Sequence, residues 1–126
     1  MVSKTIELRK VITSILKETN LEVYYENATD TAIFPYIVYN LESVNFGTVG
    51  RDDVFLIVDT WDKNDSSANI EIISDKVEDL LNNLNSPTKS VLPTFYKESR
   101  RALQDEDKSI KHRQLRFVIQ NYYIGG

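Results

Sequence analysis

Three aspartates surround the only tryptophan of the chain, in the stretch IVDTWDKND. Asp59, Asp62 and Asp65 could act as metal ligands or as an acid/base pair, because clustered carboxylates perform both kinds of chemistry. The spacing of Asp62, Asn64 and Ser66 resembles the first half of a calcium-binding loop. This segment therefore either binds a cation or marks the boundary between two structural elements.

The calcium loop is incomplete at two positions that the metal geometry requires. Its sixth position needs glycine for a sharp turn and holds Ser67, and its twelfth needs a bidentate glutamate and holds Ile73. Asp, Asn and Ser side chains also accept hydrogen bonds from free backbone N–H groups at the start of a helix. We therefore expect no metal here, and we interpret the segment as the end of a strand followed by a helix that Asp65 or Ser66 caps.

Asp59 is a different case, because it lies inside the expected strand and on the same face as Ile57 and Trp61. A buried carboxylate requires a partner, since an isolated buried charge is strongly unfavourable. We expect an ion pair with a cation of this subunit or of a neighbouring one, rather than catalysis. The candidate cations are Arg51, Lys63, Arg100 and Arg116.

No other combination of residues indicates an enzyme. The chain has one histidine, His112, and no cysteine, so it lacks the ligand set of a typical zinc site and any thiolate chemistry. The sequence contains no GxSxG nucleophile elbow and no glycine-rich phosphate loop. We therefore predict no catalytic, cofactor-binding or metal-binding residues, and we expect His112 to lie on the surface.

Length and composition indicate one globular domain over residues 1–126. The apolar content of 41% is typical of folded proteins, and no apolar run approaches the length of a membrane-spanning helix. The net charge of −4 disfavours nucleic-acid binding, because that affinity arises mainly from phosphate neutralisation. The lack of cysteine is typical of a reducing compartment, and the charges of the N-terminal segment make export unexpected.

Periodicity predicts the elements that position these residues. Apolar residues recur at helical spacing over 3–17 and 66–84, which predicts two amphipathic helices, and Asn20 can take the left-handed position that ends the first. Alternating patterns predict strands at 21–25, 36–46 and 53–61 and a long charged hairpin with arms at 90–103 and 110–124. A change of phase near Ser43 predicts a bulge or a bend there. The result is an α+β fold, with a four- to five-stranded, mainly antiparallel sheet and two helices packed on it.

The strand at 53–61 is apolar on both faces. Phe55 and Ile57 alternate with Leu56 and Val58, so neither side of this strand is polar. Such a pattern is typical of a central strand that is covered on both sides, by helices or by another subunit. Extra apolar faces and strand edges are liabilities in a monomer, so they favour a protein that assembles.

The order of these segments resembles the tail terminator, or tail-to-head joining, proteins of long-tailed bacteriophages and prophages. An N-terminal helix is followed by VYYENA, FPYIVYNL and RDDVFLIVDTWDKN, then by a second amphipathic helix and the strand DEDKSIKHRQLRFVIQNYYI. The stretches PYIVY and VDTWD carry most of the likeness. The match runs in order over nearly the whole chain.

The resemblance implies a structural protein of the virion, with no enzymatic activity, no cofactor and no membrane partner. Members of the family assemble as a hexameric ring on the tail tube. The ring stops polymerisation of the tail tube protein and joins it to the head connector or stopper protein, while DNA passes through the lumen. The subunit would be made in the cytoplasm of the bacterial host and would lie at the tail-to-head junction, in the neck. An acidic lumen would repel DNA and so prevent specific binding during passage.

Two other functions stay open. The chain could be a head-completion or stopper protein of the same neck, which the sequence separates poorly from a terminator. It could also be a small cytosolic module that binds a ligand and regulates another protein. Ligand binding would then stabilise the fold, whereas a virion protein would respond to its assembly partners.

Contacts with partners are expected at loops and hairpin tips, where a rigid scaffold presents variable side chains. The expected segments are the loop at 46–53, the hairpin tip at 104–108 and the charged arms that lead to this tip. The candidate interaction residues are Phe46, Arg51, Asp52, Asp53, Asp59, Arg100, Arg101, Asp105, Lys111, Arg113 and Arg116.

Overall fold

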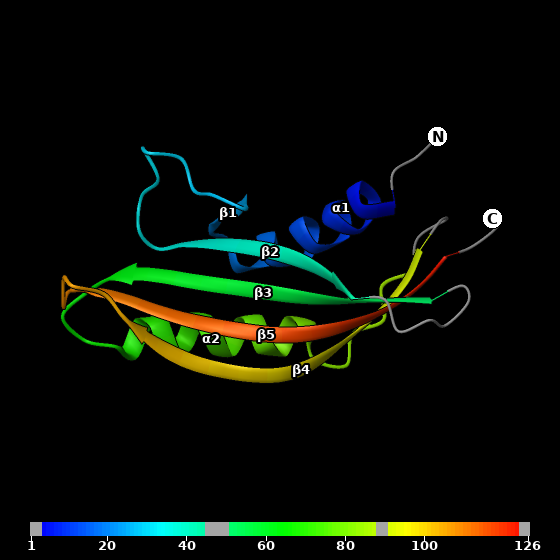
Figure 1. Cartoon of the computed structure of the whole chain (residues 1–126). Helices are drawn as coiled ribbons and strands as arrows, with labels where there is room; N and C mark the ends of the chain where they lie inside the picture. Colours follow the sequence, from blue (N-terminus) through cyan, green and yellow to red (C-terminus); the bar gives the residue numbers. More distant parts are fainter. Residues whose placement is uncertain (1–3, 45–50, 88–90, 124–126) are drawn as a thin grey trace.

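A five-stranded sheet and two helices form the computed structural model, which describes residues 4–44, 51–87 and 91–123 (Figure 1). The elements in chain order are α1 (Lys4–Leu16), the short 3-10 helix η1 (Lys17–Thr19), β1 (Glu22–Tyr25), β2 (Tyr36–Val44), β3 (Arg51–Lys63), α2 (Ala68–Leu81), β4 (Val91–Gln104) and β5 (Ile110–Tyr123). This arrangement confirms the predicted α+β fold and its long charged C-terminal hairpin, which β4 and β5 form. None of the described helices is long and apolar enough to cross a membrane.

The strand order is β1-β2-β3-β5-β4, so β3 is the central strand and β1 and β4 are the edges. Among the described strands, β1 and β2 pair in parallel and all other neighbours pair antiparallel. Every residue of β3 pairs with β5, from Arg51 opposite Tyr122 to Lys63 opposite Ile110. The central place of β3 is the one that its double apolar pattern predicted.

The predicted bulge lies in a different strand. β2 and β3 pair without interruption through Ser43, so the expectation of a bulge there is wrong. The described part of β2 runs one residue further, to Val44, which pairs with Asp53. The register shifts instead between Lys97 and Ser99 of the edge strand β4, where bulges are common.

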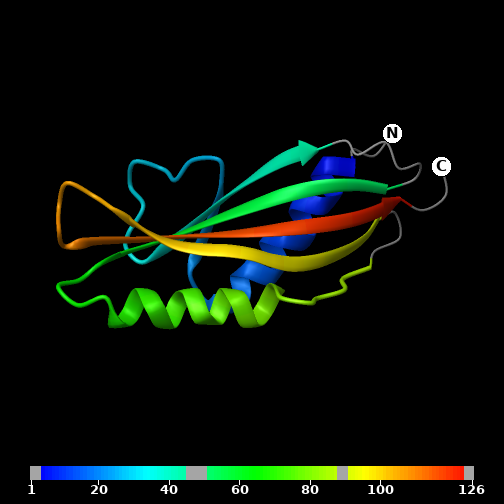
Figure 2. The same ribbon diagram turned by 60° about the horizontal axis from the view of Figure 1, so that its bottom comes forward.

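Both helices pack on the same face of the sheet (Figures 1 and 2). Leu56, Leu115 and Phe117 are completely buried beneath them. The opposite face, named here the open face, carries the intervening residues of β3, including Phe55 and Ile57, which are partly buried. In the described residues no helix covers the open face. The helices of one subunit therefore supply one of the two covers that the pattern of β3 predicted.

The start of β1 follows from the end of α1. Asn20 has a φ of 65°, as predicted for the residue that ends this helical segment, and the left-handed conformation reverses the chain. Thr19 fixes the turn, because its Oγ1 donates to the carbonyl of Leu16 at 2.7 Å and accepts from the N–H of Leu21 at 3.3 Å. The turn places β1 beside α1 at the edge of the sheet.

Candidate interaction surface

The segment IVDTWDKND ends β3 and precedes α2, as predicted. The carboxylate of Asp62 is nearly buried and accepts a hydrogen bond from Asn69 Nδ2 at 3.1 Å. Ser66 Oγ accepts from the N–H of Ala68 at 3.1 Å, although the residue in the N-cap position is Ser67, whose own side chain makes no cap bond. The described residues contain no group of three or more His, Cys, Asp or Glu side chains that could hold a metal ion. These carboxylates and hydroxyls therefore act as local connections in the structure.

Asp59 lies on the open face, and its side chain is 13% exposed. Its Oδ1 atom accepts hydrogen bonds from His112 Nε2 at 2.6 Å and from Gln114 Nε2 at 3.1 Å. The strand register explains both contacts, because Gln114 lies opposite Asp59 on β5 and His112 lies opposite Trp61. No hydrogen bond of the described residues uses Asp59 Oδ2. One oxygen of this carboxylate is therefore available to a partner.

Asp59 has no lysine or arginine partner among the described side chains of this subunit, and a cation from a neighbouring subunit stays a prediction. Arg100 lies on the helix-covered face, opposite Leu115 in the register. Arg116 shares the open face with Asp59, but its guanidinium lies 4.1 Å from the ring centre of Phe55. Its Nε atom lies 3.0 Å from Glu98 Oε1, at an ion-pair distance whose angles do not form a hydrogen bond.

His112 lies on the open face but is largely covered, so the expectation of a surface histidine is only partly met. Its side chain is 12% exposed, and its ring stacks on Trp61 with ring centres 3.7 Å apart and an interplanar angle of 16°. Trp61 stacks more distantly on Tyr36, at 6.4 Å, and Tyr36 meets the ring of Tyr24 edge-on at 6.0 Å. These four rings, named here the aromatic ladder, cross the open face from β5 to β1. Aromatic contacts of this kind stabilise a surface and fix its shape.

A shallow hollow of about 320 Å³ lies beside the aromatic ladder. The loop residues Glu26, Asn27 and Ala28 border it on one side, and Asp59 and Gln114 border it on the other. Carboxylate, amide and aromatic groups together suit a cationic or planar polar group, such as an arginine side chain of another protein. The hollow therefore has the chemistry of a contact site.

A row of polar side chains extends this site towards β4. Arg101 donates to Gln114 Oε1 from Nε at 3.0 Å and from Nη2 at 2.7 Å, while the amide of Gln114 donates to Asp59. Gln114 thus joins a predicted interaction residue on β4 to one on β3. The structure brings Asp59, Arg101 and Arg116 together on the open face, as members of one surface.

Arg100 and Arg113 instead hold α2 to the hairpin. Arg100 bonds to Asp75 at 2.6 Å, to Glu71 at 2.8 Å and to Glu78 at 3.2 Å. Arg113 Nε forms an ion pair with the same Glu71. Burial lowers the pKa of Arg100, but its hydrogen bonds to Asp75 and Glu78 outweigh that effect and raise the pKa above its ordinary value. Arg100 therefore stays charged, and both arginines form internal contacts of the subunit.

The hairpin tip holds two further predicted residues. Asp105 Oδ1 accepts from the N–H of Asp107 at 3.0 Å, and Lys111 Nζ donates to the carbonyl of Lys108 at 2.6 Å. Asp107 accepts from the hydroxyl and the N–H of Ser109, and these bonds lower its pKa. The tip is therefore an ordered turn whose acidic side chains are exposed.

Three further predicted residues lie at the opposite end of β3. Asp53 is 9% exposed and belongs to this end of the strand. Arg51 and Asp52 pair with Tyr122 and Asn121 through their backbones, and their side chains lie outside the description. Phe46 lies outside the described residues.

The aromatic ladder is the feature that sequence reasoning missed. A usable signal existed, because His112 is in phase with Gln114 and opposite in phase to the buried Leu115. Alternation alone therefore places His112 on the open face. Its pairing with Trp61 needed the register of two strands that are far apart in the sequence.

No protein-family model and no curated protein matches this chain. Solved structures do share its fold. A chain of the virion of a native gene transfer agent (GTA) particle aligns with a TM-score of 0.73 and 10% sequence identity, over 91% of this chain and 94% of that chain. A second solved chain, which carries no functional description, aligns with a TM-score of 0.76 and 12% identity, over 99% of this chain and 100% of that chain. At such identities the likeness shows the fold alone.

Proposed function

We propose that this chain is a structural protein of a phage or phage-like virion, and that it acts there as the tail terminator. The observation that carries the proposal is the likeness to a chain of a gene transfer agent virion, which spans nearly the full length of both chains. Because the likeness covers nearly the whole of both chains, a virion subunit of the gene transfer agent has the same architecture as this chain. The order of sequence motifs then favours the terminator among the proteins of the tail and neck.

The open face supports a role in assembly. Phe55 and Ile57 are only partly buried there, and the aromatic ladder lies beside a hollow with a free carboxylate oxygen on Asp59. Aromatic residues and arginine are enriched at protein interfaces, and this face carries both. In a virion, this face would be covered by a sister subunit or by a neighbouring protein of the neck.

We further propose that the protein is not an enzyme. Asp59 and His112 resemble the orienting acid and the base of a catalytic triad, which also requires a nucleophile. Among the described residues that line the hollow, Tyr36 carries the only hydroxyl group that could take the place of the triad serine. Burial, followed by the charges of Tyr24 and Asp105, raises the pKa of Tyr36, so this phenol stays protonated and weakly nucleophilic.

The chain would then act by occupying the end of the tail tube, without any chemical step. Subunits form a ring, which we propose to be hexameric, on the last layer of the tail tube and leave no free site for the next tube subunit. The opposite side of the ring presents a surface to the head connector or stopper protein, at the tail-to-head junction. DNA passes through the lumen, and the net charge of −4 per subunit disfavours its retention.

The test is tube polymerisation with the cognate tail tube protein. Electron microscopy should show shorter tubes with a cap at one end when the chain is present, and light scattering should detect its ring. A chain that remains a monomer, leaves tube length unchanged and does not bind tubes would contradict the proposal. Binding to the connector without binding to tubes would assign the stopper function instead, and stabilisation by a small molecule alone would favour a regulatory module.

A further inference from the structure

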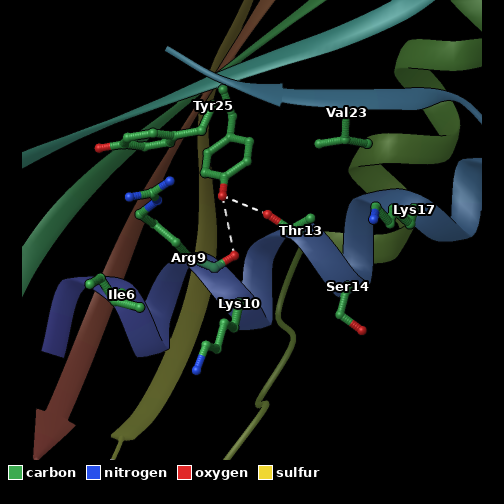
Figure 3. A pocket seen from close by; sticks show the side chains of 9 residues that line it. Ile6, Arg9, Lys10, Thr13, Ser14, Lys17, Val23 and Tyr25 are labelled. Atoms are coloured by element: carbon green, nitrogen blue, oxygen red, sulfur yellow. Dashed lines mark hydrogen bonds between the residues drawn. The ribbon is translucent and has the colours of Figure 1, made fainter. Parts of the chain in front are cut away.

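A basic groove lies between α1 and the edge strand β1 (Figure 3). It has a volume of about 680 Å³. Arg9 and Lys10 of α1 and Lys17 of η1 line one wall, and Val23 and Tyr25 of β1 line the other. The groove is on the helix side of the sheet, so it is separate from the open face.

The inner wall of the groove is ordered by the sheet. Tyr39 OH donates to the carbonyl of Arg9 at 3.1 Å and shares a hydrogen bond of 2.7 Å with Thr13 Oγ1. The guanidinium of Arg9 lies 3.9 Å from the ring centre of Tyr25, a cation–π contact that holds the side chain across the groove. The cation is therefore already positioned before any partner binds, which lowers the entropy cost of binding.

The positive charge of this groove is only partly neutralised by the described residues of the subunit. Lys10 forms an exposed ion pair with Glu7 at 3.3 Å. Neither Arg9 nor Lys17 has an acidic partner among the described residues. The groove is thus locally positive, although the chain as a whole has a net charge of −4. The groove therefore favours an acidic occupant.

The turn between β4 and β5 provides an occupant of that chemistry. Asp105, Glu106 and Asp107 are consecutive and exposed. Asp105 and Asp107 order the turn through hydrogen bonds to backbone N–H groups, while Glu106 makes no hydrogen bond to a described residue. The tip lies at one extreme of the sheet and apart from α1 in both views (Figures 1 and 2). A contact between tip and groove therefore joins two copies of the chain.

We propose that the basic groove between α1 and β1 of one subunit receives the acidic β4–β5 tip, residues 105–107, of the next subunit. This inference rests on the proposed ring. The two surfaces are different, so each subunit uses its tip towards one neighbour and its groove towards the other. Such head-to-tail contacts close into a ring when the rotation between subunits permits it, whereas a two-fold contact would stop at a dimer.

The first test exchanges charges. Glu106→Lys and Lys17→Glu should each weaken self-association by about threefold to tenfold, since each replaces an attraction at the rim of the contact with a repulsion. The combination Glu106→Lys/Lys17→Glu should restore most of the loss. Asp30→Lys and Lys76→Glu are matched controls, because they make the same charge changes at exposed positions outside the tip and the groove. Analytical ultracentrifugation measures the self-association in solution. Capping of tail tubes shows whether the ring still forms on the end of a tube.

The second test uses the natural lack of cysteine. Glu106→Cys and Lys17→Cys are prepared separately and mixed, so a short thiol-to-thiol cross-linker can join them only across two subunits. We expect a cross-linked dimer from the mixture and none from a mixture of Asp30→Cys with Lys17→Cys. A variant that carries both Glu106→Cys and Lys17→Cys should give a ladder of cross-linked oligomers that ends at the size of the ring.

The outcomes separate this inference from the function on which it rests. Rings or capped tubes that form normally in the charge variants and give no cross-link would overturn the groove contact and leave the ring intact. Loss of tube binding in Lys17→Glu without any cross-link between copies would assign the groove to another partner, which also overturns it. A wild-type chain that neither associates nor caps tubes would refute the proposed function itself.

Discussion

Replacing Tyr39 with phenylalanine tests the joint between α1 and the sheet. Tyr39 is 1% exposed, and its hydroxyl bonds to the carbonyl of Arg9 and to Thr13 Oγ1. Tyr39→Phe removes both bonds and leaves two partly buried polar groups without this partner. Each bond contributes about 1 kcal/mol and each orphaned buried group costs about 1–3 kcal/mol when fully dry, so we expect the free energy of unfolding to fall by about 2 kcal/mol.

Urea denaturation followed by circular dichroism measures this loss, from the midpoint and the slope of the transition. Thr13→Val removes one of the two partners and should cost about 1 kcal/mol. The double variant should lose less than the sum of the single variants, by about 0.5–1 kcal/mol, because the two hydroxyls share one bond. Tyr24→Phe is the matched control, since the hydroxyl of Tyr24 makes no hydrogen bond to a described residue, and its effect should stay within about 0.5 kcal/mol.

Two results would refute this reasoning. An equal loss in Tyr39→Phe and Tyr24→Phe would mean that the bonds to α1 contribute nothing to stability. Additivity of the Thr13→Val and Tyr39→Phe effects within about 0.3 kcal/mol would mean that the two hydroxyls are not coupled. In either case the hydrogen bonds of Tyr39 would not hold α1, the wall of the basic groove, against the sheet.

Three further predictions concern the other contacts. Arg100→Met should lower the free energy of unfolding by about 1–3 kcal/mol in urea denaturation, less at high salt, whereas the exposed Arg101→Met should change it by about 0.5 kcal/mol or less. His112→Ala should shift the emission of the only tryptophan to longer wavelength, because the stacked ring that shields it is removed; an unchanged spectrum would contradict the stacking. Ser109→Ala should raise the carboxyl pKa of Asp107 in an NMR titration, since it removes the hydroxyl bond, the largest cause of the lowered pKa, and keeps the bond from the backbone N–H. The stabilisation from this lowered pKa is present above the ordinary carboxyl pKa and is lost as pH falls through the folded value.

The elements themselves could be predicted from the sequence. Apolar side chains at helical spacing indicated both helices, and their observed bounds, Lys4–Leu16 and Ala68–Leu81, lie inside the predicted ranges. The double apolar pattern around Leu56 indicated a central strand, and the left-handed conformation of Asn20 followed from its type and position. These features depend on residues within one or two turns of each other, so a local pattern is sufficient to predict them.

The contacts of the candidate surface could not be predicted in the same way. Asp59 and His112 are 53 residues apart in the sequence, and their contact depends on the register of β3 against β5. A shift of one residue would move His112 to the other face of the sheet. The sequence therefore indicated correctly that Asp59 needs a partner, but only the paired strands identify that partner.

The sequence by itself determined the helices, the strands and the central place of β3, because the periods of 3.6 and 2 residues are properties of the local backbone. Tertiary structure decided which arginines are free to meet a partner. The bulge between Lys97 and Ser99 reverses the alternation of β4, so Arg100 lies beneath α2 while Arg101 lies on the open face. Since a bulge depends on how two strands pair, no pattern within β4 alone could assign those faces.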